Sequence, residues 1–257
     1  MKARIQYRTG AICLRLLDYG ESDKIVTFCT EEFGKVRGIA KGAKRSRRRF
    51  ANALEPFSRS ELLFSRRGSE GLALIEASDV TCHFPLIRAD LEKTLIASYF
   101  IDLADHFLPE DKKNAPLFGL LNDFLKLLEA RPAEEALLRF FEIRLLMLSG
   151  YDPALDHCLT CKTPLGNRSL YRFTPAAGGI TCDACPPRGP EGIPVSVGTL
   201  RTLLLCRELP IDRLNRLLLT EQSAAESRRL LSHFIRHLLG RELKSLQVLN
   251  DIRRLVT

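Results

Sequence analysis

Hydrophobic and polar residues alternate in short stretches through the first 82 residues. In the first stretch, Ala11–Leu17, the side chains of Ile12, Leu14 and Leu16 are predicted to share one face. Turn residues separate it from four further apolar stretches, at Ile25–Cys29, Lys35–Ala40, Glu61–Arg66 and Leu72–Ala77. Five short strands in about eighty residues favour a small closed barrel such as an OB-fold. An SH3-like barrel would give a similar pattern.

Beyond Phe84-Pro85 the apolar spacing becomes helical. Two stripes follow steps of three and four residues: Ile96, Phe100, Leu103 and Phe107, then Leu117, Leu121, Phe124 and Leu128. Pro132 is predicted to open a third helix, with Gly150 just past its end. Helical spacing resumes at Ser196, a candidate N-cap, and a later stripe of leucine and phenylalanine ends at Gly240. The simplest reading is a helical body with an insertion.

The insertion differs in composition from both flanks. Residues 152–194 hold seven of the 13 prolines and five glycines, with too little apolar content to fold by core burial alone. We therefore predict an α+β multidomain protein with four segments. These are a five-stranded barrel, of which the OB-fold is one candidate, at 1–82, helices at 83–150, an inserted module at 151–194 and the remaining helices at 195–257.

The insertion carries four cysteines in the pattern C-x2-C-x20-C-x2-C, at Cys158, Cys161, Cys182 and Cys185. Two such pairs at this separation are typical of a tetrahedral zinc site. The alternatives are four unrelated thiols or two disulfides. Four sulfur ligands would leave no open coordination position, so the expected cofactor is one structural Zn²⁺ ion and zinc-dependent hydrolysis is not expected.

The other cysteines and the chain's start favour a reducing compartment. Cys13, Cys29, Cys82 and Cys206 lie among apolar residues and are predicted to be buried thiols. No stretch approaches the roughly 20 apolar residues that cross a bilayer, and the first residues lack an apolar signal core. We therefore expect a cytoplasmic protein with no membrane partner.

The net charge of +8 is concentrated at the N-terminal end, where residues 1–82 carry 16 basic and 10 acidic side chains. Eight basic residues and no acidic one lie between positions 35 and 54: Lys35, Arg37, Lys41, Lys44, Arg45, Arg47, Arg48 and Arg49. Such a segment matches the phosphates of a nucleic acid. Its alternative is a solvated charge run that aids solubility. Among nearby aromatic residues, Phe50 is the first candidate for stacking on a base.

No catalytic motif is visible. His233 and His237 have the spacing of zinc-protease ligands, but the glutamate of that motif is missing between them. A phosphate-binding Gly-x4-Gly-Lys-Ser/Thr loop, a Gly-x-Ser-x-Gly elbow and a His-x-Glu deaminase motif are also missing from the sequence. The expectation is a protein that is not an enzyme.

The chain resembles the RecO family of bacterial DNA repair proteins from end to end. The most specific stretch is Asp18-Tyr19-Gly20-Glu21-Ser22-Asp23-Lys24-Ile25-Val26. Further matching motifs are Phe33-Gly34-Lys35, Lys41-Gly42-Ala43-Lys44, Leu54-Glu55-Pro56-Phe57 and, near the end, Leu239-Gly240-Arg241-Glu242-Leu243-Lys244-Ser245. The cysteine array matches the zinc-bearing members, whereas other members lack some of these cysteines.

The resemblance implies a recombination mediator of the RecFOR pathway with an N-terminal OB-fold. Such proteins bind single- and double-stranded DNA, anneal complementary strands, and act with RecR and the acidic tail of single-stranded DNA-binding protein to load RecA. Carried over to this sequence, the DNA contacts fall on Lys35, Arg37, Lys41, Lys44 and Arg45. Arg47, Arg48 and Arg49 are added on charge alone.

Two other function classes remain open. Basic barrels and zinc ribbons also occur in regulators of transcription or RNA. GTPase-activating zinc fingers of the Arf type have a similar spacing of cysteine pairs, and that reading would need Arg168 or Arg172 as a catalytic arginine. Binding to DNA and RNA, annealing, and GTPase stimulation distinguish the three.

Overall fold

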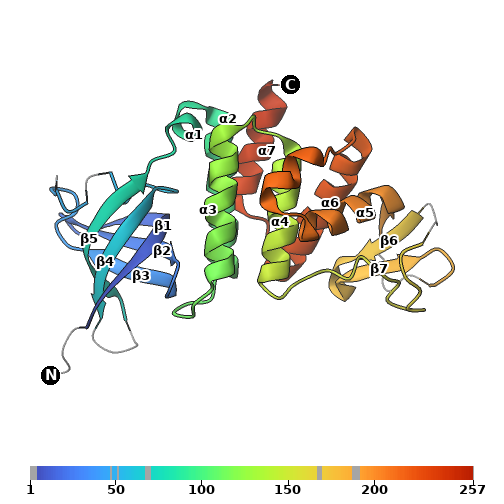
Figure 1. The fold of residues 1–257 in the computed structure, drawn as a ribbon, viewed down its shortest axis with the longest axis horizontal. Coiled ribbons are helices and arrows are strands. Elements are labelled where there is room, and N and C mark those ends of the chain that lie inside the picture. Colours follow the sequence, from blue (N-terminus) through green and yellow to red (C-terminus); the bar gives the residue numbers. More distant parts are fainter. Residues whose placement is uncertain are drawn as a thin grey trace. The chain divides into compact units, whose positions relative to one another are not determined.

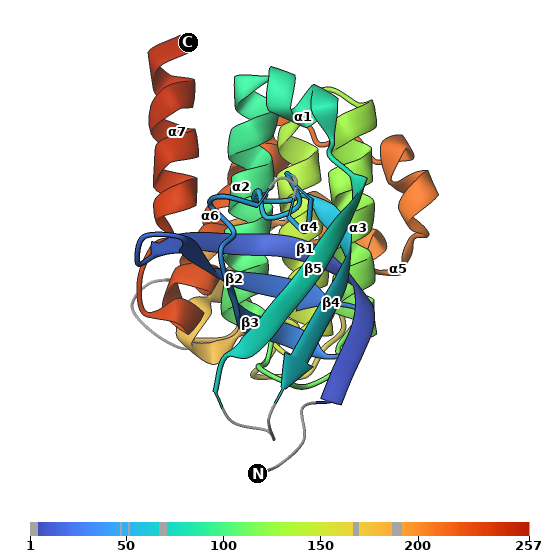
Figure 2. The ribbon, with the colours of Figure 1, turned by 90° about the vertical axis from the view of Figure 1, so that its left-hand side faces the viewer.

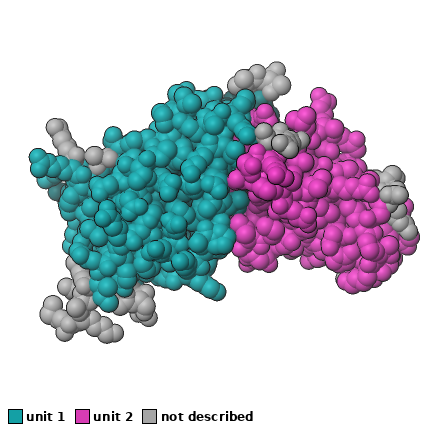
Figure 3. Space-filling model, in the orientation of Figure 1, with its two compact units in different colours: residues 1–132, 245–257 teal, residues 133–244 magenta. Residues whose placement is uncertain are grey.

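A computed structural model describes residues 5–46, 48–50, 52–66, 71–166, 170–186 and 192–256. They form two compact units, residues 1–132 with 245–257 and residues 133–244 (Figure 3). The units group the four predicted segments in a new way. The barrel belongs with the first helices and the C-terminal residues, and the four-cysteine segment belongs with the helices on either side of it.

Five strands close into a barrel in the first unit, in the order β1-β2-β3-β5-β4 (Figure 2). The strands are β1 (Ile5–Tyr19), β2 (Asp23–Thr30), β3 (Gly34–Ala40), β4 (Arg59–Arg66) and β5 (Ala73–Cys82). All neighbours are antiparallel except β3 and β5, which pair in parallel at Gly38 with Ala73 and at Ile39 with Leu74. This confirms the predicted five-stranded OB-like barrel.

The predicted face of β1 is wrong because the strand contains a bulge. Its register to β2 shifts between Cys13 and Arg15, so Leu14 is an extra residue. Ala11 and Cys13 belong to the barrel core before the bulge, and Leu16 packs against that core after it. Ile12 and Leu14 are therefore on the outer face, where they are still buried because α2 packs on β1.

Four helices complete the first unit: α1 (Pro85–Ala89), α2 (Leu91–Phe107), α3 (Ala115–Ala130) and α7 (Lys244–Val256). The side chains of Asp90 and Asn114 cap α2 and α3 by accepting hydrogen bonds from backbone amides. The hydroxyl of Ser245 donates to Asp102 of α2 over 2.6 Å. The predicted stripes at 96–107 and 117–128 correspond to α2 and α3.

The second unit combines three helices with a small sheet (Figure 1). Its helices are α4 (Glu135–Leu148), α5 (Val197–Glu208) and α6 (Glu221–Leu239), and η1 (Pro175–Ala177) and η2 (Ile211–Arg216) are 3-10 helices. The sheet has the order β7-β6-β8, from β6 (Leu170–Thr174), β7 (Gly179–Cys182) and β8 (Ile193–Ser196). Ser196 caps α5 and Gly240 ends α6, as predicted.

Pro132 does not open a helix. It forces the preceding Arg131 into an extended conformation, with φ −133° and ψ 164°, which ends α3. The next helix, α4, begins three residues after the proline, at Glu135. None of the described helices is long and apolar enough to cross a membrane.

The sheet of the second unit has more core than its composition suggests. Tyr171, Phe173, Ile180 and Val195 are buried, and the Phe173 ring meets Phe234 of α6 edge-on at 5.5 Å. Because β8 packs on α5 and α6, the insertion shares the hydrophobic core of the helices around it. Core burial therefore contributes to the order of this segment.

Candidate metal centre and nucleic-acid interface

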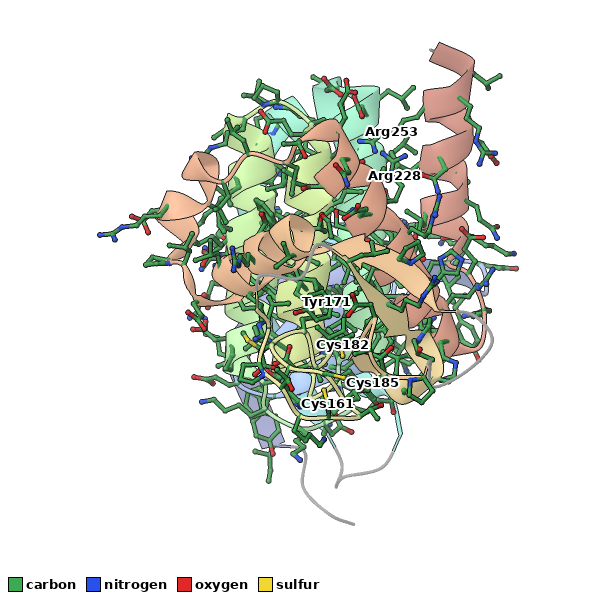
Figure 4. All side chains as sticks on the ribbon, turned by 90° about the vertical axis from the view of Figure 1, so that its right-hand side faces the viewer. Cys161, Tyr171, Cys182, Cys185, Arg228 and Arg253 are labelled. Atoms are coloured by element: carbon green, nitrogen blue, oxygen red, sulfur yellow. The ribbon has the colours of Figure 1, made fainter. Side chains whose placement is uncertain are left out.

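The four predicted cysteines meet at one end of the small sheet. Their Sγ atoms all lie within 4.8 Å of one another, and the Sγ atoms of Cys161 and Cys182 are 3.8 Å apart. Cys158 and Cys182 are buried, whereas Cys161 is exposed. Figure 4 shows Cys161, Cys182 and Cys185 gathered together, near Tyr171.

Backbone hydrogen bonds hold each cysteine pair in a tight turn. The amide of Lys162 donates to the carbonyl of Cys158, and the amide of Cys185 donates to that of Cys182. Lys162 has a φ of 62°, which turns the chain back after Cys161. The first turn is anchored on β7 because Leu159 donates to the carbonyl of Ile180 over 2.8 Å. Backbone hydrogen bonds, one of them to β7, therefore hold the two cysteine pairs opposite each other.

The four thiols do not ionise alike. The pKa of Cys161 is lowered to about 6 because the hydroxyl and backbone amide of Thr163 hydrogen-bond to its sulfur. The pKa of Cys185 is raised to about 12, chiefly by its hydrogen bond with Cys182 and then by burial. Negative charge on one sulfur opposes ionisation of the next, and a bound cation removes that repulsion.

The cluster fits a divalent metal ion with sulfur ligands. A tetrahedral Zn²⁺ with Zn–S bonds of about 2.3 Å requires sulfur atoms about 3.8 Å apart. The distance between Cys161 and Cys182 matches this value, and the remaining sulfur pairs are within reach of it. The four cysteines can therefore hold one metal ion, with no coordination position left for water or substrate.

The predicted basic segment forms the connection between β3 and β4. Lys41, Arg45, Arg48 and Arg49 are exposed, and none of them has an acidic ion-pair partner within the described part of the chain. Arg49 donates to the carbonyl of Lys41 over 2.9 Å and lies over the ring of Phe50. Arg47 was also predicted here and lies outside the described residues. We call residues 41–50 the cationic loop.

The cationic loop is fastened to the turn between β1 and β2. The carboxylate of Asp23 accepts a hydrogen bond from the Gly42 amide over 2.8 Å, and the Lys44 amide donates to the carbonyl of Ser22. Hydrogen bonds from the Gly42 amide and the Ser22 hydroxyl lower the pKa of Asp23. Lys44 itself pairs with Asp18 at 3.3 Å. Its charge is partly neutralised, unlike that of Arg45.

Lys35 and Arg37, the two predicted contacts on β3, have different environments. Lys35 is mostly buried, and its ammonium pairs with the carboxylate of Asp105 at 3.3 Å and donates to the carbonyl of the same residue. Arg37 is exposed and lines a groove of about 180 Å³ on the outer face of the barrel. Arg15, which sequence reasoning missed, lines the same groove, but its guanidinium pairs with the carboxylate of Asp105 at 2.8 Å.

The aromatic residue exposed beside the cationic loop is Tyr19 and not the predicted Phe50. Phe50 is buried in the barrel core, with 4% of its surface exposed, so its ring is not available for stacking on an open surface. Tyr19 is 54% exposed at the end of β1, next to Gly20, whose carbonyl accepts from Lys44 over 3.0 Å. Tyr19 is therefore the aromatic residue presented beside the cationic loop.

Two of the C-terminal arginines are engaged within their own units (Figure 4). Arg228 of α6 pairs with Glu135 at 2.8 Å, and Arg253 of α7 pairs with Glu92 at 2.7 Å. Arg254 is exposed and pairs with Asp251 in the preceding turn. The ion pairs of Arg228 and Arg253 each join two helices. Their charges therefore have acidic partners, unlike those of the exposed arginines that the structure describes in the cationic loop.

The fold and the two sites define a class of protein with an OB barrel, a cationic loop and a four-cysteine module inserted in a helical body. Family models give the same picture: residues 1–84 match "Recombination protein O N terminal" and residues 88–247 match "Recombination protein O C terminal". The chain belongs to the RecO family.

Curated relatives match along the whole chain. The DNA repair protein RecO of Syntrophus aciditrophicus is 51% identical over 257 residues, covering 99% of each chain. That of Geobacter metallireducens is 40% identical and covers 95% of this chain and 97% of its own. That of Anaeromyxobacter dehalogenans (strain 2CP-C) is 37% identical and covers 95% of both.

Proposed function

We propose that this protein acts in DNA repair as a recombination mediator. It binds single- and double-stranded DNA, anneals complementary strands, and works with RecR and the tail of single-stranded DNA-binding protein to load RecA. It does this without making or breaking a covalent bond, so it is not an enzyme. Family membership supports the repair role, and the relatives are named as DNA repair proteins.

The cationic loop is the observation that carries the proposal. Lys41, Arg45 and Arg48 are exposed and form no ion pair within 4 Å among the described residues. Their charge is available to phosphates, since no internal ion pair must be broken first. Neutralising two phosphate backbones lowers their repulsion, which lets complementary strands meet and pair.

The test replaces Lys41, Arg45 and Arg48 together with alanine. Three lost phosphate contacts should flatten the slope of log affinity against log salt by about 2 for single-stranded DNA, at about 0.7 per contact, and should slow annealing. The matched control replaces Lys112, Lys113 and Lys126, which removes the same charge from exposed positions after the barrel. An unchanged slope in the loop variant, or equal effects in both variants, would contradict the proposal.

We further propose that the four cysteines bind one Zn²⁺ ion with a structural role. The support is the closeness of the four sulfur atoms and the backbone-defined turns that hold them. Metal analysis of natively purified protein should find one zinc per chain. A different metal, or none, would contradict the assignment.

The alternative of a zinc-ribbon regulator of transcription or RNA has no specific observation in its favour. The GTPase-activating reading needed Arg168 or Arg172, of which Arg168 lies outside the described residues. Arg172 is on β6, where its register partners are Thr181 and Pro194. Preference for DNA over RNA in binding and annealing remains the measurement that separates the first alternative from the proposal.

A further inference from the structure

A pocket of about 330 Å³ opens at one end of the barrel, beneath the cationic loop. Its lining comes from three segments: Leu16 on β1, Lys24 on β2, and the β3–β4 connection with Ala43, Ser46, Phe50, Asn52, Leu54 and Glu55. The volume is at the small end of the range for ligand pockets, which is about 300–1,000 Å³.

The pocket lining combines polar and apolar side chains. Phe50 and Leu54 are almost fully buried and belong to the barrel core, so the floor is apolar and fixed. Lys24 and Asn52 provide donors, and Glu55 provides an acceptor that already holds Arg88 at 3.0 Å. Lys24 has no ion-pair partner in the described ranges. Its ammonium is therefore available to an acceptor on a ligand.

We infer that this pocket binds one unpaired nucleobase of a DNA strand whose flanking phosphates lie on the cationic loop. The inference rests on the proposed function and adds a base-binding site to it. A base has two apolar faces and an edge of donors and acceptors, which suits a lining where the apolar Leu16 lies beside the polar Lys24 and Asn52.

Two other occupants fit less well. A phosphate inside the pocket would lie against the Glu55 carboxylate, which repels it. An apolar peptide side chain would leave the polar groups of Lys24 and Asn52 without partners, which is unfavourable when they are desolvated. The geometry also gives annealing a physical step, because a base held here is unstacked and separated from its neighbours.

The first experiment compares a single-stranded oligonucleotide with an abasic sugar-phosphate chain of the same length, at the same salt concentration. The full-length protein should bind the base-containing strand at least about 5-fold more tightly. Ala43→Leu, which fills the pocket, should reduce that ratio while leaving affinity for the abasic chain unchanged. Lys24→Met, which removes a donor and a positive charge from the pocket, should also reduce the ratio. The variant of Lys41, Arg45 and Arg48 should weaken both ligands and leave the ratio unchanged.

The outcomes separate the inference from the function on which it rests. Binding of neither ligand would overturn the proposed function. Equal binding of both ligands, or a wild-type ratio in folded Ala43→Leu and Lys24→Met variants, would overturn the pocket and leave the cationic loop intact.

A second measurement uses the wild-type protein, so its result does not depend on whether a variant folds. Irradiation of the wild-type complex with an oligonucleotide carrying 5-iodouracil should cross-link the base to residues that line the pocket, such as Leu16 or Lys24, as mapped by mass spectrometry. Cross-links confined to residues outside the pocket, such as Tyr19, would overturn the inference.

Discussion

Gly34, the first residue of β3, combines two constraints at one position. Its φ is +66°, a conformation that residues with a side chain rarely adopt. A Cβ atom there would also overlap the carbonyl oxygen of Lys112, in the segment between α2 and α3. Gly34 thus lets this segment lie directly against the barrel, which explains the Phe33-Gly34-Lys35 motif in physical terms.

Gly34→Ala should therefore destabilise the protein by about 2–4 kcal/mol, from backbone strain together with the steric overlap. Gly20→Ala is the matched control, because Gly20 has a φ of +57° but open space where the Cβ atom would be. It should cost only about 1–2 kcal/mol. Chemical denaturation of both variants checks this, and equal losses would show that the contact with Lys112 contributes nothing.

At the nucleic-acid interface, the sequence predicts which residues are basic but not which of them are paired or buried. The basic segment was visible as charge, and the free state of Arg45 agrees with that reading. The pairing of Lys35 with Asp105 was not visible, because the partners are 70 positions apart and meet only when α2 packs on the barrel. The burial of Phe50 depends on the path of the loop, which charge and periodicity do not determine.

At the level of elements, Glu226 of α6 connects a strand and two helices. Its carboxylate accepts hydrogen bonds from the Ser196 amide and hydroxyl and from the Thr199 hydroxyl, at 2.6–2.9 Å. Burial alone would raise its pKa, but these hydrogen bonds outweigh that effect and lower it. The ionised form is therefore the one that stabilises the fold around the start of α5.

Glu226→Gln should lower the free energy of unfolding by about 1–2 kcal/mol at neutral pH. Because the folded-state pKa is below the unfolded one, the contribution of Glu226 is complete above the unfolded pKa and is lost as pH falls through the folded pKa. The difference between wild type and variant should thus be constant above the ordinary glutamate pKa of 4.5 and shrink as the pH falls below it. A difference that is constant with pH would rule out the carboxylate as its source.

The presence of each strand and helix was more predictable than which of its sides is buried. All five barrel strands and the stripes of α2 and α3 follow from periodicity, because burial on one side imposes a repeat of two or of three to four residues. The β1 bulge does not, since one inserted residue leaves the composition of the strand unchanged. Helix α7 was not identified as an element, although its Leu246 and Leu249 are buried at helical spacing.

At the scale of the whole molecule, the cysteine cluster lies in only one of the two units. Cys158 to Cys185 lie within residues 133–244, and the barrel has a separate core. Removing the metal by chelation, or by Cys158→Ser, should lower the thermal stability of the second unit and leave the unfolding of the barrel unit unchanged. Cys82→Ser is the matched control, since Cys82 ends β5 and is remote in sequence from the cluster.

Hydrogen exchange measured by mass spectrometry would resolve the two units. Faster exchange in β6 and β7 after chelation, with unchanged exchange in β1–β5, is the expected result. Uniform acceleration across the chain would mean that the units do not unfold separately, and no change in either unit would contradict a structural metal.

The placement of α7 has a consequence for how the protein is made. This helix completes the first unit, where it buries Leu249 and is bonded to α2 through Ser245 and Arg253. During synthesis the ribosome releases the barrel early, but the helix that finishes its unit emerges only after residues 133–244. The nascent barrel unit therefore remains incomplete while residues 133–244 are translated. A product terminated before residue 244 would leave the side of α2 that α7 covers open to solvent.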